Sequence, residues 1–173
     1  MDLKIELLCK QDARDLFEFE YKNRAFFERM VPSRGDEYYH FEHFCHILSE
    51  LLLEQAERIS YFYLIRDEND NIVGRINLVD TEVDGSIRMG QLGYRIGEEQ
   101  IGKGLATKAV NMLLKMLPDE YGIHEVHAKT TEDNFGSQKV LEKNHFTLVA
   151  VDEDKNANEV FKHYIWKNER FKE

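Results

Sequence analysis

A glycine-containing segment between a strand pattern and a helix pattern is the feature that most constrains this chain. Residues 97–104 read GEEQIGKG, after a run in which apolar residues alternate and before a run with apolar residues three and four positions apart. The segment matches seven positions of the pattern GxxxxGK[ST] and has Gly104 at the eighth, where a Ser or Thr hydroxyl would bind Mg²⁺. Because that hydroxyl is absent and Glu98 and Glu99 would repel a triphosphate, the sequence argues against a nucleotide triphosphatase.

The same segment suits a phosphate that is held without a metal ion. Gly102 and Gly104 allow close approach of the backbone, and the amides that follow open a helix whose N-terminus carries about half a positive charge. A diphosphate would fit such a site, and an ordinary tight turn before a helix is the alternative explanation. The rest of the sequence has to distinguish the two.

Hydrophobic periodicity predicts the order of strands and helices. The expected elements are a strand at 3–8, helices from 12 and at 23–30 and 36–58, strands at 60–66, 72–79 and 86–96, a helix at 102–117, a strand at 123–131, a helix at 134–144, and strands at 145–151 and 160–167. This order predicts an α/β (α+β) fold with a mixed, mostly antiparallel sheet of about seven strands flanked by helices. No linker, repeat or low-complexity segment interrupts residues 1–173, so we expect a single domain.

Charge and cysteine content narrow the range of partners. The formal net charge of −10 disfavours a nucleic-acid surface and suits a cationic partner. The N-terminal residues mix acid and base, and no run approaches the roughly 18 apolar residues of a membrane span, so we expect no signal peptide, no membrane insertion and a cytoplasmic location. Cys9 and Cys45 form no CxxC pair, so neither a disulfide framework nor a structural zinc site is expected.

Two segments of the second half of the chain are similar to motifs of a known family. They read LGYRIGEEQIGKGLATKAV at 92–110 and TTEDNFGSQKVLEKNHF at 130–146. Together they resemble the GCN5-related N-acetyltransferases (GNAT), and within these the RimJ/RimL type, which acetylates protein N-termini, notably of ribosomal proteins. The order of elements fits the GNAT fold over essentially the whole chain, whereas the motifs cover about half of it.

The resemblance implies acetyl-CoA as the cosubstrate. Its pyrophosphate would lie on the amides of residues 101–106, its pantetheine arm would pair like an extra strand with the backbone at 94–96, and Asn134 would hold that arm or a helix terminus near it. The implied cofactor-binding residues are Tyr94, Arg95, Ile96, Ile101, Gly102, Lys103, Gly104, Leu105, Ala106, Thr107, Asn134 and Ser137.

The chain departs from the family pattern at four positions. Ile101 stands where Arg or Gln usually precedes GKG, but binding is expected to survive because backbone amides make the phosphate site. Leu141 replaces a tyrosine that often protonates the thiolate, and Gln91 replaces a glutamate that often acts as base. His145 replaces the glycine that ends the second helix in a left-handed conformation, so we expect the cap to shift to Asn144.

Catalytic groups must therefore come from other positions. Ser137 matches a serine that RimL-type enzymes place near the CoA sulfur, and its hydroxyl would donate a hydrogen bond to the forming thiolate; a polar residue in the first turn of a helix is the alternative. Glu132 is a candidate base, with Asp80 and Glu82 as others, and each is otherwise a solvated surface residue. Tyr94 either orients the substrate or packs in the core.

The histidines do not predict a metal site. His40, His43 and His46 follow one another at intervals of three, which carries them around a helix instead of aligning all three on one face. His124 and His127 are three apart on a strand and therefore point to opposite faces, as partly exposed strand residues.

The expected reaction is transfer of an acetyl group from acetyl-CoA to a primary amine, with a peptide N-terminus as the acceptor. An α-amino group titrates near pH 7.7–8.0 and a lysine near 10.4, so the former needs only a weak base or a chain of waters at neutral pH. A polyamine, an amino acid or an antibiotic is an alternative acceptor, and a CoA-binding regulatory module without turnover is an alternative of another class. A homodimer is permitted but not required.

Overall fold

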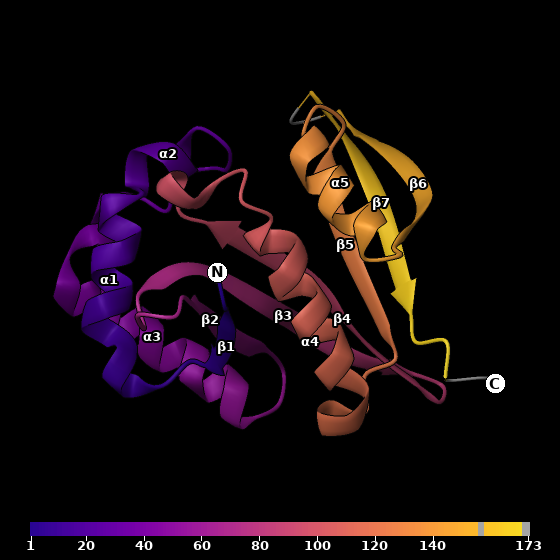
Figure 1. Cartoon of the computed structure of the whole chain (residues 1–173), viewed down its shortest axis with the longest axis horizontal. Coiled ribbons are helices and arrows are strands. Elements are labelled where there is room, and N and C mark those ends of the chain that lie inside the picture. The colour runs from indigo at the N-terminus through magenta and orange to yellow at the C-terminus, as the bar shows by residue number, and fades with distance from the viewer. Residues whose placement is uncertain (156–157, 171–173) are drawn as a thin grey trace.

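The computed structural model describes residues 1–155 and 158–170 and has a seven-stranded sheet at its centre (Figure 1). The strands are β1 (Lys4–Leu7), β2 (Tyr61–Arg66), β3 (Ile72–Asp84), β4 (Ile87–Ile96), β5 (Glu125–Thr131), β6 (Thr147–Asp154) and β7 (Glu159–Lys167). Their spatial order is β1-β2-β3-β4-β5-β7-β6, and among these neighbours only β4 and β5 run parallel. The predicted mixed, mostly antiparallel sheet is confirmed.

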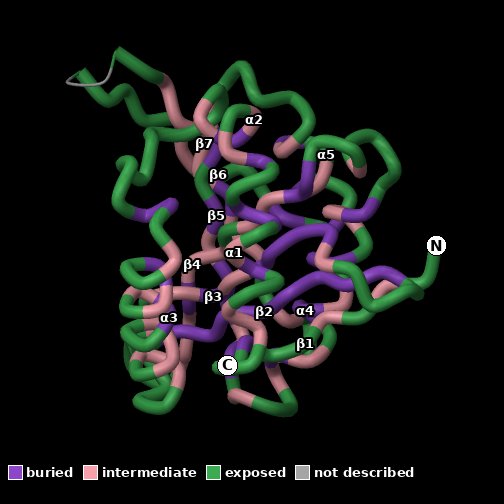
Figure 2. Tube along the Cα trace, turned by 90° about the vertical axis from the view of Figure 1, so that its left-hand side faces the viewer, coloured by how far each residue is buried: buried purple, intermediate pink, exposed green. Residues whose placement is uncertain are grey.

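Helices cover the two faces of this sheet. The α-helices are α1 (Ala13–Lys22), α2 (Arg24–Glu28), α3 (Phe41–Ala56), α4 (Leu105–Tyr121) and α5 (Phe135–Lys143), and short 3₁₀ turns lie at Lys10–Asp12, Asp36–Tyr39 and Glu98–Gln100. One apolar core lies between the sheet and α4 and α5, and a second lies between the sheet and α1 to α3. Figure 2 shows the buried residues running through the central strands, with exposed turns outside them. Within residues 1–155 and 158–170, no helix is long and apolar enough to cross a membrane.

Strand β2 shows why both faces are covered. Tyr61, Tyr63 and Ile65 belong to the core beside α4, whereas the intervening Phe62 and Leu64 belong to the core beside α1 and α3. All five side chains are buried. A continuous apolar run is typical of a strand that packs on both faces, and this accounts for the absence of polar residues in the run.

Two elements in the first half of the chain differ clearly from the prediction. The helix expected at 36–58 is a 3₁₀ turn followed by α3, because the backbone of His40 is extended (φ −102°, ψ 123°) and interrupts the helical path. The strand expected at 72–79 continues to Asp84, so Asp80 and Glu82 lie within β3 instead of in a loop. A register shift between Val79 and Glu82 marks a bulge, which breaks the period of two on which the prediction depended.

Helix α4 does not stop at Pro118, as the sequence predicted, but includes it and continues to Tyr121. Pro118 has no amide to donate to the carbonyl four residues earlier, so the helix lacks one bond in its last turn and continues past it. Gly122, at φ 64°, ends the helix: its amide donates to the Pro118 carbonyl and the Ile123 amide donates to the Leu117 carbonyl. This pair of bonds is the usual termination by a left-handed glycine.

The end of α5 corrects the predicted shift of its cap. Asn144 has φ −97°, whereas His145 itself adopts the left-handed conformation at φ 64°. Asn144 is instead buried, and its side-chain amide donates to the carbonyls of Thr107 and Val140. The side chain of Asn144 therefore joins α5 to α4, and the backbone strain is carried by the exposed His145.

Replacing His145 by Gly is expected to raise the free energy of unfolding by about 0.5–1 kcal/mol, since relief of the left-handed conformation exceeds the extra entropy of glycine in the unfolded chain. Urea denaturation of His145→Gly and Asn144→Gly provides the comparison. The second variant loses two buried hydrogen bonds and should be destabilised by about 1–3 kcal/mol. The reverse order of stabilities would mean that the cap lies at Asn144 after all.

Candidate functional site

An opening between β4 and β5 is the main irregularity of the sheet. The two strands pair only at Met89 with Glu125, Gly90 with Val126 and Gln91 with His127. Beyond that point β4 continues to pair with β3 as far as Ile96, and β5 continues to pair with β7 as far as Thr131. The strands therefore diverge toward their C-terminal ends, as Figure 1 shows. Backbone groups on the facing edges of both strands lack a strand partner there, which is the arrangement that can accept an extended chain.

The glycine segment lies at the open end, between β4 and α4. Gly102 and Gly104 have φ of 79° and 74°, and a Cβ built on either one would meet no atom within 4 Å. Helix α4 accordingly begins at Leu105, with Gly104 as its N-cap, and not at Gly102 as predicted. The first-turn amides of an α-helix have no acceptor within the helix, so those of Leu105 and Ala106 are available to an anion. Side chains would narrow this space, and the two glycines leave it open.

The two glutamates of the segment face away from these amides. Glu98 accepts from Arg29 at 2.8 Å and Glu99 from Lys22 at 2.9 Å, so both carboxylates are paired with cations of α1 or the residues after α2. The repulsion of a phosphate that the sequence suggested is thereby reduced. Ion pairing at this exposed position contributes little to stability, but it fixes the direction in which the carboxylates point.

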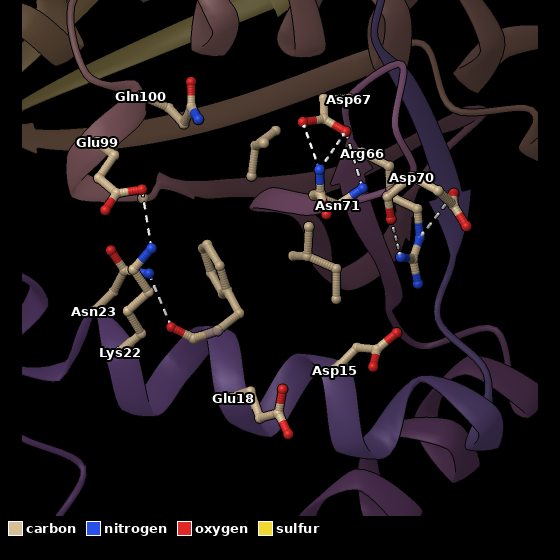
Figure 3. A pocket seen from close by; sticks show the side chains of 14 residues that line it. Asp15, Glu18, Lys22, Asn23, Arg66, Asp67, Asp70, Asn71, Glu99 and Gln100 are labelled. Carbon is tan, nitrogen blue, oxygen red and sulfur yellow. Dashed lines mark hydrogen bonds and ion pairs between the residues drawn. The ribbon is translucent and has the colours of Figure 1, made fainter.

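A pocket of about 480 Å³ lies on the α1 side of the same segment (Figure 3). It is lined by α1, by the β2-β3 turn and by residues before the glycines, and its carboxylates are those of Asp15, Glu18, Asp67, Asp70 and Glu99. Lys22 and Arg66 are the cations of its lining, and Lys22 is already paired with Glu99. Because carboxylates predominate, the pocket has the wrong charge for a diphosphate, which favours the amide side of the segment.

Tyr94 and Ser137 meet across the opening. The phenol oxygen of Tyr94 on β4 lies 2.8 Å from the hydroxyl oxygen of Ser137 on α5. Asn134 caps α5, since its side-chain oxygen accepts from the Ser137 amide at 3.0 Å. Burial holds the pKa of Tyr94 above its usual value of 10, against a smaller opposite effect of Ser137, so the phenol keeps its proton at neutral pH. The geometry thus provides a hydroxyl pair with a proton to donate.

The remaining predicted cofactor residues are distributed around the opening. Arg95 points its side chain to the α1 face, where it contacts Glu20 and Phe27, so only its backbone faces the opening. Lys103 donates to Gln100 at 2.8 Å and is exposed. Ile96 and Leu105 are buried, Ala106 and Thr107 are half-buried, and Ile101 is exposed.

The side chain of Glu132 does not join the hydrogen bond between Tyr94 and Ser137. It follows β5, its side chain is exposed, and its backbone carbonyl accepts from Gln138 at 2.8 Å. Leu141, at the position where a tyrosine was expected, is 1% exposed and belongs to the apolar core. A hydroxyl at position 141 would therefore lie in the core, and Ser137 with Tyr94 supplies hydroxyls nearer to solvent.

A buried charge cluster lies beneath β4 on the α1 face. Glu20 is fully buried, with its carboxylate oxygens 2.7 Å from Arg75 and 3.3 Å from Arg95. Burial alone would raise the pKa of Glu20, but the charges of Arg75, Arg95 and Arg34 hold it below its usual value of 4.5. Tyr38 accepts from both Arg75 and Arg34. One carboxylate thus faces three guanidinium groups, and the cluster has a net positive charge.

Gly93 and Asn77 leave open space above this same face of the sheet. They are paired across β3 and β4, and a Cβ at Gly93 would meet no atom within 4 Å. The side-chain oxygen of Asn77 is buried and has no hydrogen-bond partner among the described residues. A buried acceptor without a donor is costly, so this position favours a ligand that carries an N–H group.

Sequence reasoning missed a histidine pair beside the point where β4 and β5 part. His127 Nδ1 lies 3.0 Å from His163 Nε2, and His127 Nε2 lies 2.6 Å from a carboxylate oxygen of Glu125. His124 lies just before β5 and lines a pocket with residues of α4, whereas the partner of His127 is on β7, some 36 residues later. Only the pairing of β5 with β7 brings these rings together, so spacing along the chain gave no signal.

The other histidines have no such arrangement. His40, His43 and His46 line a shallow surface pocket with Glu37 and Glu42, and all three are exposed. Within the part of the chain that the structure describes, no group of three or more His, Cys, Asp or Glu residues is arranged to hold a metal ion.

Comparison with known proteins identifies this arrangement. Residues 2–147 match the family model described as the acetyltransferase (GNAT) domain. The probable N-acetyltransferase YjcK of Bacillus subtilis (strain 168) is 29% identical over 137 residues, which are 76% of this chain and 73% of that protein. The ribosomal-protein-S5-alanine acetyltransferase from Vibrio fischeri has a TM-score of 0.91 at 20% identity, covering 100% of this chain and 97% of that one. RimL, a ribosomal L7/L12 α-N-protein acetyltransferase in complex with coenzyme A, has a TM-score of 0.86 at 19% identity, covering 98% and 96%.

The family model spans most of the chain, and the solved structures share its whole fold. The protein belongs to the GNAT family of N-acetyltransferases.

Proposed function

We propose that this protein transfers the acetyl group of acetyl-CoA to a primary amine, and that the amine is the N-terminus of a peptide or protein. The observation that carries the proposal is the opening between β4 and β5, which has Gly102 and Gly104 at its mouth and the Tyr94 and Ser137 hydroxyls across it. The coenzyme A and the α-N-protein substrate named for the RimL complex support it, as does the ribosomal-protein substrate named for the Vibrio fischeri enzyme.

In this proposal the chain binds the cosubstrate through its backbone. The amides of residues 101–106 would hold the pyrophosphate, helped by the positive end of α4. The backbone of residues 94–96 would pair with the pantetheine arm along the free edge of β4. The space beside the glycines fits a diphosphate because no side chain enters it.

The bound cosubstrate supplies an activated thioester, and the protein supplies orientation and protons. Tyr94 remains protonated at neutral pH, so it can donate to Ser137, whose hydroxyl can then donate to the departing thiolate. Asn134 holds the first turn of α5 and thereby fixes the Ser137 hydroxyl relative to β4. The acid is therefore a pair of hydroxyls instead of the tyrosine that Leu141 replaces.

The acceptor would approach over Gly93 on the opposite face of the sheet. Gly93 leaves room for a peptide backbone, and the buried oxygen of Asn77 would accept from one of its N–H groups. A polycation is disfavoured there, because Glu20 is outnumbered by Arg75, Arg95 and nearby Arg34. The acidic total charge of the chain is therefore a poor guide to the acceptor.

Substrate choice is tested by mass spectrometry after incubation with acetyl-CoA and separate acceptors. A short peptide with a free N-terminus should gain one acetyl group, whereas the same peptide with a blocked N-terminus and an internal lysine should gain none. Spermidine and free amino acids represent the small-amine alternative. Tight binding of acetyl-CoA with no release of free thiol against any acceptor would instead indicate a regulatory module.

Replacing Ser137 by Ala is expected to lower kcat by roughly 10- to 100-fold, because the leaving thiolate loses its hydrogen-bond donor. The affinity for acetyl-CoA should change much less, since the backbone amides of the glycine segment are intact. Ser49→Ala is the control, because Ser49 is an exposed serine on α3 that bonds only to the Cys45 carbonyl. Release of free thiol, followed at saturating acetyl-CoA, measures both variants, and equal turnover of Ser137→Ala and the parent chain removes Ser137 from the mechanism.

A further inference from the structure

We propose that His163, aligned by His127 and Glu125, accepts the proton that the acceptor amine loses. The inference rests on the proposed acetyl transfer and assigns the base that neither Gln91 nor an exposed Glu132 provides. The three residues are hydrogen-bonded in a row: His127 lies on β5 at the point where β4 and β5 part, with Glu125 on the same strand and His163 on β7, the next strand beyond β5.

The position of the hydrogen-bonded residues Glu125, His127 and His163 follows from strand register. Gln91 and His127 are the last paired residues before β4 and β5 diverge. If the pyrophosphate lies beyond Ile96 and the pantetheine arm follows β4 inward, five residues of strand, about 17 Å, lead to that point. The thioester would therefore lie near Gln91, with His127 on the neighbouring strand.

The face on which the histidines lie is the one open to the acceptor. Val126 and Tyr164 belong to the core beside α4 and α5, so the alternate residues His127 and His163 point to the other face. The core beneath α1 to α3 contains no residue of β5 or β7 among those described. Gly93 and Asn77 open onto the same face. The acid pair and the histidine pair thus lie on opposite faces of the sheet, so different groups serve the departing thiolate and the attacking amine.

The hydrogen-bond pattern determines which nitrogen is free. In the tautomer that donates to the Glu125 carboxylate oxygen, the hydrogen of His127 lies on Nε2. In neutral His127, Nδ1 is then an acceptor and must receive the hydrogen of His163 Nε2. This leaves the lone pair on His163 Nδ1, which no hydrogen bond reaches among the described residues.

The surrounding charges keep this lone pair available. Burial is the largest effect that lowers the pKa of His163 below its usual value of 6.5, and the charge of Lys129 acts in the same direction, against an opposite effect of Asp152. On the side away from His163, the Glu125 carboxylate is paired with Lys167 at 3.5 Å. His163 is therefore neutral at pH 7 and can take a proton.

The proton balance of the step is complete within the protein. As the amine nitrogen bonds to the acyl carbon, its proton passes to His163 Nδ1, directly or through one water. The hydrogen on His163 Nε2 passes to His127 Nδ1, and the resulting imidazolium faces Glu125. The carbon–sulfur bond breaks, and the thiolate takes a proton from the Ser137 and Tyr94 pair. Water then restores both pairs.

The test is the pH dependence of His163→Gln with an N-terminally free peptide and acetyl-CoA. At pH 7 kcat/KM should fall by about 100-fold, which is typical of losing a general base. Above about pH 9 the α-amino group, with a pKa of 7.7–8.0, is already neutral and solvent hydroxide can take the proton lost during attack, so the deficit should shrink toward parity. Glu125→Gln should show a smaller deficit with the same recovery, because it removes only the charge that supports the relay. His43→Gln, on an exposed turn of α3, is the matched control and should behave as the parent chain at every pH.

Calorimetric titration with CoA shows whether the variants are folded, and the affinity of His163→Gln should be within 2-fold of the parent chain. An equal rate at pH 7, or a deficit that does not change with pH, would overturn the assignment of His163 alone, since the parent chain would still transfer acetyl groups. Absence of transfer by the parent chain with every acceptor would contradict the proposed function and this inference together.

Discussion

Replacing Gly104 by Glu is expected to weaken the binding of CoA by at least about 100-fold, which corresponds to the loss of two or more charge-assisted amide bonds and an added like charge. Gly104 is the N-cap of α4 at φ 74°, and a side chain there would enter the open space beside the first-turn amides. A carboxylate would both occupy that space and neutralise the positive end of the helix. Isothermal titration calorimetry with CoA measures the effect.

Gly85→Glu is the matched control for this variant. Gly85 also has a positive φ, 61°, and a Cβ there also meets no atom within 4 Å, but it lies in the β3-β4 turn. Both variants thus carry similar backbone strain, roughly 1–2 kcal/mol, and the same added charge. Gly85→Glu should bind CoA as the parent chain does. Equal affinities of the two variants would show that the glycine segment does not bind the diphosphate.

Replacing Glu20 by Ala is expected to lower the free energy of unfolding by about 3–5 kcal/mol, because it leaves the buried guanidinium of Arg75 and the half-buried one of Arg95 without their carboxylate. Arg75 is 4% exposed, so water cannot replace the lost partner. Urea denaturation at pH 7 measures this loss. The same variant should also disturb the acceptor face, since Arg95 on β4 loses the group that holds it beside Phe27.

Glu99→Ala provides the control for the charge change. Glu99 is paired with Lys22 on the surface, where both side chains are more than 60% exposed, so its loss should cost less than about 1 kcal/mol.

The contribution of Glu20 to the free energy of unfolding depends on pH. The pKa of Glu20 is lowered on folding, so its contribution is present above its usual value of 4.5 and is lost as the pH falls through the lower folded value. The difference between the parent chain and Glu20→Ala should therefore shrink in acid, and a constant difference would contradict the assignment.

Much of the fold could be predicted because its elements have strong local periods. The strands at 60–66 and 86–96 and the helix after Gly104 lie within a few residues of their predicted bounds. The errors occur where a tertiary effect overrides a local rule. The bulge after Val79 hid the continuation of β3, and Gly122 ended α4 in place of Pro118. At His145 the burial of Asn144 against α4 outweighs the cost of a left-handed residue.

The parts of the candidate site also differ in how far the sequence predicts them. The phosphate-binding segment is contiguous and built from backbone, so its glycines reveal it in the sequence. Tyr94 and Ser137 were each singled out separately, but their contact depends on the packing of α5 beside β4. The histidine pair and the Glu20 cluster join residues from distant elements. Neither has a fixed spacing in the chain, so only the three-dimensional structure brings them to attention.

Mass spectrometry of one peptide in two forms, after incubation with the protein and acetyl-CoA, tests most directly whether the protein acetylates a peptide N-terminus. Both forms contain one internal lysine, and only one has a free N-terminus. We expect one acetyl group on the free N-terminus and none on the blocked form, with stoichiometric release of CoA thiol. Acetylation of the lysine in both forms, or transfer to spermidine with neither peptide modified, would contradict it.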